Sequence, residues 1–327
     1  MPNAERSVLH VLPHAEGGGD TYVDVLTGMP RYAFTRVYLA TRRKTGITAR
    51  GVADVLRAVR AHDLLHVHGE GAAALLLPLL AARRSVVTLH GLHLLRRVNG
   101  WKRQVAALNL QAVVRAANRT ICVSHAEHEA LAAVVGARRL VVIHNGVRVS
   151  AETPPAHVDL PRPIGIWVGS LDERRDPVAV VRAAERTSTS LLVVGDGALR
   201  GDVERAAARH VRVLGQRADV APLLAAADFF VLMSEREGLS FALLEAMAHG
   251  LPAIVADIAE NREAIGDSGI AVPYGDEDAV AAAMERLRDD VARADLGARA
   301  RERIDERFSA AQMIEGTRAV YDAVFAE

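Results

Sequence analysis

The sequence predicts an α/β protein with two doubly wound domains, each built on a parallel sheet. Short apolar runs alternate with longer amphipathic segments along the whole chain, as expected for strands that alternate with helices. Residues 151–163 contain four prolines and separate two such series, and proline cannot join a central strand. Net charge divides at the same place, with +11 over residues 1–150 and −11 over 151–327. This asymmetry indicates two domains with different partners.

The N-terminal domain, residues 1–150, is predicted to hold six strands and the helices between them. The expected strands are Val8–Leu12, Val37–Ala40, Leu64–His68, Ser85–His90, Arg119–Ser124 and Leu140–His144. The expected helices are Thr21–Thr27, Gly51–Ala61, an Ala/Leu-rich segment that ends near Ala82, Trp101–Ala117 and His125–Val135.

The C-terminal domain, residues 151–305, repeats the pattern. Its expected strands are Ile164–Val168, Leu191–Val194, Val211–Leu214, Phe229–Leu232, Pro252–Val255 and Ile270–Val272. Residues 306–327, with an amphipathic stretch at Ser309–Phe325, are expected to form a helix that packs back on the N-terminal domain. Ligands of such sheets bind at the carboxyl ends of the strands, which predicts a ligand cleft between the two domains.

Composition excludes several classes of protein. A single cysteine, Cys122, rules out a disulfide framework and an all-cysteine metal site. Residues 1–7 are polar, and the longest apolar run, residues 71–82, is too short to span a bilayer. We therefore expect a cytoplasmic protein without a secretory signal.

The most informative motif follows the apolar strand 229–232. Gly238 permits a tight turn, and Ser240 is placed to cap the next helix, whose free N–H groups and partial positive charge suit a phosphate. Glu245 lies among leucine, alanine and methionine residues, where a carboxylate is costly unless a ligand or partner meets it. Glu237 and Glu245 are thus predicted to flank a bound anion. The alternative is an acidic cap and a surface glutamate.

Glu237 and Glu245, separated by seven residues, resemble the E-x7-E signature of retaining GT-B glycosyltransferases of the GT4 group. The likeness is strong over residues 164–280 and weaker over 1–150, and it implies two facing Rossmann-like domains with an interdomain cleft. It also implies that Glu237 binds the hydroxyls of the transferred sugar and Glu245 the ribose of the nucleotide. Backbone amides meet the sugar and phosphates in that family, which here are those of Gly238, Leu239 and Ser240.

A second motif begins at Gly169, after the first strand of the C-terminal domain. It is similar to the family pattern G-R-L-x-x-x-K-G, whose two cations hold the diphosphate. Arg175 occupies the lysine position, whereas Ser170 replaces the arginine. The loss of one cation weakens the predicted diphosphate site. Arg174 is a candidate to compensate, and a mixed-charge surface turn is the alternative.

Glycines mark three further loops. Gly195 and Gly215 follow two strands of the C-terminal domain, and the resemblance places these loops under the nucleotide and its base. Gly18 and Gly19 belong to a triple glycine in the N-terminal domain, which the resemblance places at the cleft.

Ten of the 13 histidines lie in residues 1–150. No carboxylate or cysteine spacing supports a metal site, so structural histidines are expected in general. His90 is the exception, because the resemblance places a T-x-H histidine beside the donor sugar. His68 and His125 are second candidates for contact with an acceptor in the cleft.

Residues 94–103 combine basic, apolar and aromatic side chains. With the positive N-terminal domain, they point to an anionic or lipid-linked acceptor, or to peripheral contact with the inner face of a membrane. A solvated loop is the alternative. Nucleic acid is not expected, because no recognised binding module accompanies the charge.

The resemblance implies transfer of a sugar, with retention, from a nucleotide-diphosphate sugar to an acceptor hydroxyl in polysaccharide or glycoconjugate synthesis. Glu237, His90 and Arg175 are the expected catalytic residues. No cofactor or metal is expected, because no D-x-D triplet ends a strand. Two alternatives stay open: a GT-B epimerase or hydrolase of the nucleotide sugar, and a non-catalytic binding partner, which Ser170 favours.

Overall fold

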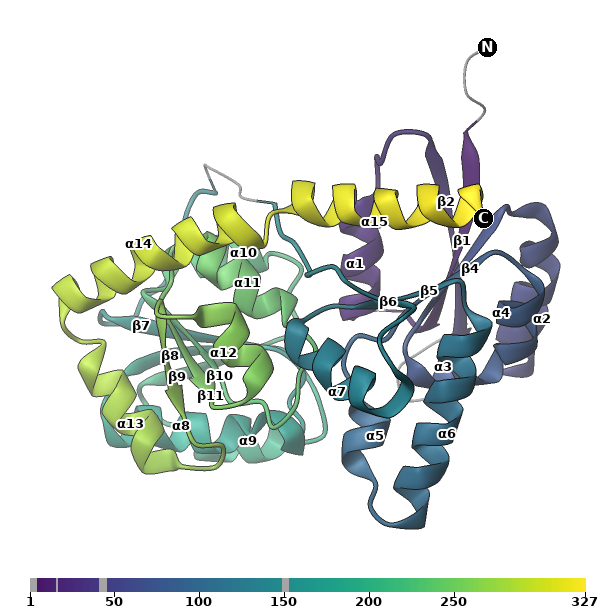
Figure 1. The fold of residues 1–327 in the computed structure, drawn as a ribbon. Coiled ribbons are helices and arrows are strands. Elements are labelled where there is room, and N and C mark those ends of the chain that lie inside the picture. Colours follow the sequence, from purple (N-terminus) through teal and green to yellow (C-terminus); the bar gives the residue numbers. More distant parts are fainter. Residues whose placement is uncertain (1–4, 16, 41–45, 149–152) are drawn as a thin grey trace. The chain divides into compact units, whose positions relative to one another are not determined.

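The computed structural model describes residues 5–15, 17–40, 46–148 and 153–327. Contacts divide the chain into two compact units, Met1–Gly146 with Ala310–Glu327, and Val147–Ser309. Each unit is a six-stranded parallel sheet with helices on both faces (Figure 1). The predicted α/β class with two parallel sheets is confirmed. The predicted domain boundary at 150/151 lies outside the described residues.

The first sheet has the strand order β2-β1-β3-β4-β5-β6. Its strands are β1 (Arg6–His14), β2 (Tyr32–Ala40), β3 (Leu64–His68), β4 (Ser85–Thr88), β5 (Arg119–Cys122) and β6 (Leu140–Val142). Side chains alternate between its faces. Leu9, Val11, Leu65 and Val67 enter an apolar core, which is completed by α2 (Ala49–Ala58), α3 (Glu70–Leu75), α4 (Leu77–Ala82), α5 (His93–Arg97), α6 (Trp101–Ala116) and α7 (His125–Val135).

The opposite face of this sheet is covered by α1 (Gly18–Leu26) and by the last helix, α15 (Ala310–Ala326) (Figure 1). The Tyr32 hydroxyl donates a 2.7 Å hydrogen bond to Asp322 of α15, and Tyr22 of α1 lies 3.4 Å from the Thr317 hydroxyl. The end of the chain is therefore part of the first unit. Residues 306–309 belong instead to the second unit, because α14 (Asp290–Arg307) continues through the predicted boundary.

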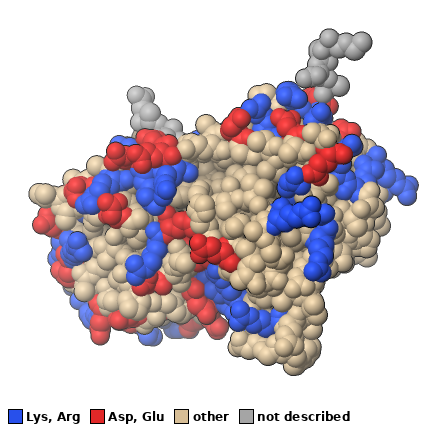
Figure 2. Space-filling view, in the orientation of Figure 1, with Lys and Arg blue, Asp and Glu red and all other residues tan. Residues whose placement is uncertain are grey.

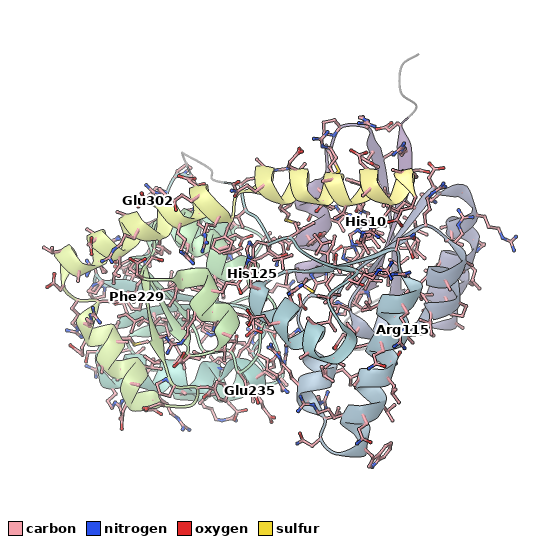
Figure 3. The ribbon with its side chains drawn as sticks, in the orientation of Figure 1. His10, Arg115, His125, Phe229, Glu235 and Glu302 are labelled. Atoms are coloured by element: carbon pink, nitrogen blue, oxygen red, sulfur yellow. The ribbon has the colours of Figure 1, made fainter. Side chains whose placement is uncertain are left out.

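The second sheet has the order β12-β11-β10-β7-β8-β9. Its strands are β7 (Ile164–Val168), β8 (Ser190–Val194), β9 (Val211–Gly215), β10 (Phe229–Leu232), β11 (Ala253–Ala256) and β12 (Gly269–Val272). Its other helices are α8 (Pro177–Arg186), α9 (Arg200–Ala206), α10 (Val220–Ala226), α11 (Phe241–Ala248), α12 (Ala259–Ile265) and α13 (Glu277–Arg286). Phe229 lies fully buried at the start of β10 (Figure 3). Its ring occupies the space that a Cβ on Gly165 would need.

Many predicted elements differ from the observed ones at their ends, and three of these differences have a clear local cause. The helix expected from Thr21 begins at Gly18, because the Gly17 carbonyl accepts hydrogen bonds from the amides of Asp20 and Thr21. The Ala/Leu-rich helix breaks at Leu76, before a proline that lacks an N–H donor. The strand expected to reach His90 ends at Thr88, because His90 has a φ of 60°.

Glu127, in the first turn of α7, stabilises the turn that follows β4. Its carboxylate is fully buried and accepts hydrogen bonds from the amides of Gly91, at 2.5 Å, and Val123, at 2.6 Å. Ser124 caps the same helix by accepting from the Glu127 amide. Burial raises the pKa of Glu127 to about 7, while the two backbone donors act in the opposite direction. The loop that carries His90 is thus tied to the start of α7.

Among the described residues, no helix is both long and apolar enough to cross a bilayer.

Candidate functional site

In the second sheet, the order in which successive strands are added reverses between β7 and β10. The chain passes from β7 to β8 on one side, and β10 later pairs on the other side of β7. In open α/β sheets, ligands bind outside the carboxyl ends of the strands at such a switch point. The loops that leave β7 and β10 there carry the two predicted motifs. Glu235 lies just beyond the end of β10 (Figure 3).

Arg175 and Glu237 meet at this switch point. Arg175 Nη2 lies 3.2 Å from Glu237 Oε1, and the two side chains are 19% and 10% exposed. The Glu235 amide also donates a 2.7 Å hydrogen bond to the Arg174 carbonyl, which joins the two loops. The structure therefore brings together two predicted site residues of opposite charge from separate motifs.

Buried polar atoms without a hydrogen-bond partner gather in the same two loops. They include Arg175 Nε, Asp172 Oδ1, Ser234 Oγ and Arg236 Nε, and Glu237 Oε1, which has only its ion pair with Arg175. Trp167 Nε1, within β7, has no hydrogen-bond partner either. Most buried polar groups in proteins are hydrogen-bonded, to protein, water or a ligand, so these atoms leave capacity for polar partners at the switch point. Sequence reasoning did not single out Trp167 and Ser234. Their signal was a polar atom placed at the end of an otherwise apolar strand.

The predicted glycines link three neighbouring strand ends. The Gly169 amide donates to the Val194 carbonyl, and the Gly195 amide donates to the Gly215 carbonyl at 2.8 Å. Gly195 has a φ of 141°, and a Cβ there would lie 1.8 Å from the Gly169 oxygen. Close backbone packing therefore requires glycine at 195 without any ligand. Contact of these loops with a nucleotide stays a prediction.

Glu245 lies on α11, whose first turn follows Gly238 and Leu239. Ser240 caps this helix by accepting a 3.4 Å hydrogen bond from the Leu243 amide. Glu245 is partly buried, and no hydrogen bond or ion pair reaches its carboxylate from the described residues. Burial raises the pKa of Glu245 to about 7. The arrangement leaves a carboxylate with unused acceptor capacity.

The compensating role expected of Arg174 receives no direct support. Its guanidinium forms a 3.3 Å ion pair with Asp172, so its charge is already balanced locally. Ser170, where the family pattern has arginine, is partly exposed. Arg175 is also paired, but its partner Glu237 is itself a predicted site residue, so Arg175 stays the candidate in this loop for binding a phosphate.

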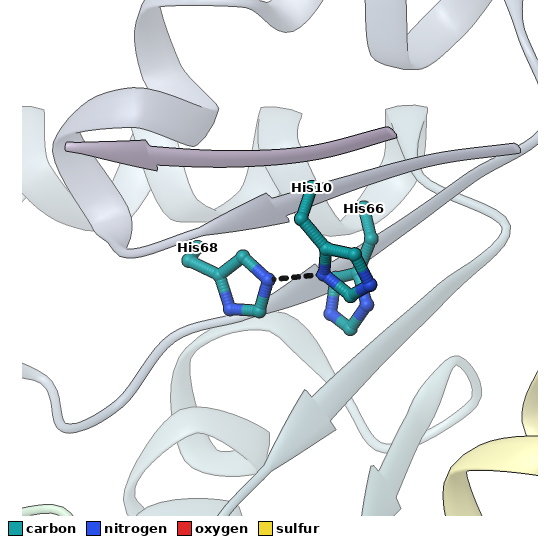
Figure 4. Close-up of side chains that lie close together, drawn as sticks. All are labelled: His10, His66 and His68. Atoms are coloured by element: carbon teal, nitrogen blue, oxygen red, sulfur yellow. Dashed lines mark hydrogen bonds between the residues drawn. The ribbon is translucent and has the colours of Figure 1, made fainter. Parts of the chain in front are cut away.

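In the first unit, the switch point lies between β1 and β3, and histidines occupy it. His10 Nδ1 lies 2.9 Å from His68 Nε2, and His68 Nδ1 lies 2.9 Å from His90 Nε2. His10, His66 and His68 are fully buried (Figure 4). His68 therefore contacts other histidines rather than solvent. Of the linked histidines His10, His68 and His90, only His90 is partly exposed. Burial is the main cause that lowers the pKa of each of these imidazoles.

The other first-unit candidates lie apart from this chain of histidines or at its edge. Gly18 and Gly19 form the first turn of α1. His125 is exposed at the start of α7, with its ring 5.2 Å from that of His144.

His10, His66 and His68 place ring nitrogens within 4.8 Å of one another, as a metal site would. Two nitrogens that bind one tetrahedral ion at about 2.1 Å stand about 3.4 Å apart, whereas His10 and His68 are 2.9 Å apart. His66 uses both ring nitrogens, with the Tyr321 hydroxyl at 2.6 Å and the Thr88 hydroxyl at 2.8 Å. This geometry fits a hydrogen-bond network better than metal coordination.

Comparison with known proteins identifies both halves of the chain. Residues 9–151 match the family model "Glycosyltransferase Family 4", and residues 162–290 match "Glycosyl transferases group 1". The chain is 30% identical over 289 residues to alpha-maltose-1-phosphate synthase of Mycobacterium tuberculosis, which covers 74% of this chain and 73% of that protein. It is 32% identical over 151 residues to N-acetyl-alpha-D-glucosaminyl L-malate synthase of Bacillus anthracis, over 44% of this chain and 40% of that protein. The chain spans about half the length, or less, of several such relatives.

Solved structures agree in fold. Sucrose-phosphate synthase from Thermosynechococcus elongatus superposes with a TM-score of 0.82 and 20% identity, over 98% of this chain and 99% of that one. Anabaena HepE in complex with UDP-glucose superposes with a TM-score of 0.77 and 17% identity, over 97% and 99%. The expected GT-B fold is thereby confirmed. The chain belongs to the GT4 family of GT-B glycosyltransferases.

Proposed function

We propose that this protein is a retaining glycosyltransferase that moves a sugar from a nucleotide-diphosphate sugar to an acceptor hydroxyl in polysaccharide or glycoconjugate synthesis. The observation that carries the proposal is the group at the β7/β10 switch point. It combines the Arg175–Glu237 ion pair, unpartnered buried polar atoms and, on α11, the unpaired carboxylate of Glu245. Anabaena HepE, of the same fold, binds UDP-glucose, which supports a nucleotide-sugar donor.

The proposed reaction breaks the bond between the anomeric carbon and the diphosphate oxygen. The bond to the acceptor oxygen forms on the same face of the sugar, and the leaving phosphate oxygen takes the acceptor proton. Negative charge grows on the diphosphate, where Arg175 and the free N–H groups at the start of α11 stabilise it. Glu237 binds hydroxyls of the sugar as its ring gains positive charge, and Glu245 binds the ribose. Because these groups supply the needed charge, the proposed mechanism uses no metal ion.

Acceptor chemistry is inferred from the surface of α5 and α6, which we call the α5–α6 surface. Trp101, Val105 and Leu108 repeat at helical spacing on α6 and are 69%, 54% and 63% exposed. The neighbouring cations Arg97, Lys102 and Arg103 have no ion pair with any described residue. Figure 2 shows this lower lobe as mostly uncharged, with Lys and Arg atoms at one side.

Exposed apolar side chains flanked by free cations suit an anionic lipid surface. Each cation near such a surface contributes about 1 kcal/mol to binding, and the apolar stripe adds burial of hydrophobic area. We therefore propose that the acceptor is lipid-linked or anionic. We also propose that the protein acts at the cytoplasmic face of a membrane.

The test of transfer measures nucleotide release from UDP-glucose, GDP-mannose and ADP-glucose with EDTA present, with and without lipid extracts as acceptors. The α configuration of the product, determined from the proton coupling of its anomeric carbon, would support retention. Glu237→Gln is expected to lower kcat and Glu245→Gln to raise KM. Release at the same rate without any acceptor favours the hydrolase alternative. Conversion of the donor into another nucleotide sugar without nucleotide release favours the epimerase alternative. Binding without turnover favours the non-catalytic one.

The pH dependence of donor binding tests Glu245. A carboxyl with a pKa of about 7 is about one-tenth ionised at pH 6 and about nine-tenths at pH 8. Ribose hydroxyls donate to the ionised form, so UDP-glucose should bind roughly tenfold more tightly at pH 8 than at pH 6. The phosphates of this donor do not titrate in that range. The stability of the protein without ligand changes with pH in the opposite direction. Because the pKa of Glu245 is raised in the folded state, its contribution to the free energy of unfolding is lost as pH rises through about 7.

Calorimetry of the wild type and of Glu245→Gln provides the comparison. The variant should bind weakly and with little pH dependence. An equal pH dependence in both proteins would contradict the role of Glu245.

Membrane contact is tested with Trp101, because the other tryptophan, Trp167, is fully buried. Phosphatidylglycerol vesicles should shift its fluorescence to shorter wavelength, whereas phosphatidylcholine vesicles should not. In sedimentation with the anionic vesicles, Leu108→Glu should lose binding. Val291→Glu, at a position 78% exposed on α14 of the second unit, serves as a matched control. Equal binding by both variants would show that the α5–α6 surface is not the contact.

A further inference from the structure

The buried histidines of the first unit form an ordered chain along one face of the sheet. His10 lies on β1, His68 on β3 and His90 just after β4. Consecutive members are 2.9 Å apart, and their rings are near parallel, at 24° and 22°. His10 lies on the face that α1 and α15 cover, because its neighbours Leu9 and Val11 enter the core on the opposite face. The donor-binding account above gives His10 and His68 no role.

Proton counting limits this chain to two states. Burial lowers the pKa of all three imidazoles, so each ring is neutral near pH 7 and carries one N–H. Each hydrogen bond needs one donor and one acceptor nitrogen. The proton therefore sits either on Nδ1 of all three rings or on Nε2 of all three rings.

The buried end of the chain distinguishes the two states. His10 Nε2 is buried and has no hydrogen-bond partner. Protonation at Nε2 would leave a buried N–H without an acceptor, whereas protonation at Nδ1 leaves only an unused acceptor. Buried N–H groups without a partner are the rarer case in proteins. The state with all protons on Nδ1 is thus favoured.

We propose that His68 is a positioning residue that holds His90 in its Nδ1–H tautomer, with His10 as the buried end of the histidine series. The bond partner of one ring nitrogen decides where the proton of the other lies, so His90 presents Nδ1–H as a donor. No hydrogen bond from a described residue uses that nitrogen. Its ligand is a hydroxyl or phosphate oxygen of the donor substrate, and this part rests on the proposed function.

Neighbouring rings fix the orientation of the linked histidines. His66 stacks on His68 at 4.3 Å and 22°, and it is held by Tyr321 of α15 and by Thr88. The edge-on ring of Tyr22 lies 5.3 Å from His68 and 5.1 Å from His90. Rings fixed in this way lose little entropy when they align for a ligand.

The first test reads the tautomers directly, in the free protein and without any substrate. Two-bond proton–nitrogen NMR spectra of 15N-labelled protein separate Nδ1–H from Nε2–H rings, and single histidine substitutions assign the signals. We expect Nδ1–H for His10, His68 and His90 in the wild type. In His68→Leu, His90 should lose this signature, whereas in His10→Phe it should persist, because the buried His68 Nε2 is then the nitrogen without a partner. Nε2–H throughout, with the His10 proton resting on the Phe34 ring 5.0 Å away, would overturn the proposal.

Two variants separate positioning from general damage to the core. Tyr321→Phe removes a hydrogen bond from the same buried cluster but not from the chain, so the His90 signal should persist. The side-chain amide of His68→Asn can still donate an N–H to His90 Nε2, so His90 should keep its Nδ1–H tautomer. His68→Leu has no such donor, so His90 should lose that tautomer. Loss of the tautomer in Tyr321→Phe would assign the effect to packing and contradict the proposal.

Kinetics then tests the consequence for the donor. Loss of one well-placed hydrogen bond in His68→Leu should lower kcat/KM roughly tenfold, although buried His68 touches no substrate. Unchanged kcat/KM with an altered His90 tautomer would overturn the positioning role while leaving the proposed transfer intact. If the wild type transfers no sugar, the proposed function fails, and the NMR result still decides whether the chain exists.

Discussion

The ion pair between Arg175 and Glu237 is the interaction on which the account of the second unit depends. Parallel strands all end at one edge of a sheet, so the loops after β7 and β10 converge even though β8 and β9 separate them in sequence. Burying two charges is repaid only if their remaining hydrogen-bonding capacity is used, yet Arg175 Nε has no hydrogen-bond partner and Glu237 Oε1 has only its ion pair with Arg175. A diphosphate offers acceptors for the guanidinium, and sugar hydroxyls offer donors for the carboxylate. A ligand of both kinds, as proposed above, would use this remaining capacity.

The switch point of the first unit is built differently. It buries neutral histidines that satisfy one another and the hydroxyls of Thr88 and Tyr321. A neutral network costs less to bury than a charged one, and it joins His10 on β1 through His68 to His90. The last helix, α15, supplies Tyr321 to this network. Its packing on the first unit therefore also completes a hydrogen bond to a buried histidine.

Local pattern predicted the twelve strands because each is a short apolar run bounded by turn residues, and their order along the chain gave the α/β class. Arg175 and Glu237 were identified by motif, but their contact depends on the crossover between β7 and β10, which spacing alone does not reveal. Glu127 was missed as the support of the His90 turn, although Ser124 three residues before it is a capping signal. His68 was expected at a cleft and is buried, since alternation along a strand gives the face of a side chain but not what covers it. The pairing of Arg174 with Asp172 likewise required coordinates.

The most direct measurement of the central claim is thermal unfolding with UDP, GDP, ADP and dTDP in the presence of EDTA, for the wild type, Arg175→Met and Arg182→Met. Arg182 is exposed on the following helix, α8, and serves as the matched loss of charge. A nucleotide at 100 times its dissociation constant should add about 2.7 kcal/mol to the free energy of unfolding. The account predicts this stabilisation for one nucleotide, in the wild type and Arg182→Met but not in Arg175→Met, each against its own unliganded protein. Stabilisation of all three proteins alike, or of none, would contradict a nucleotide diphosphate site at the β7/β10 switch point.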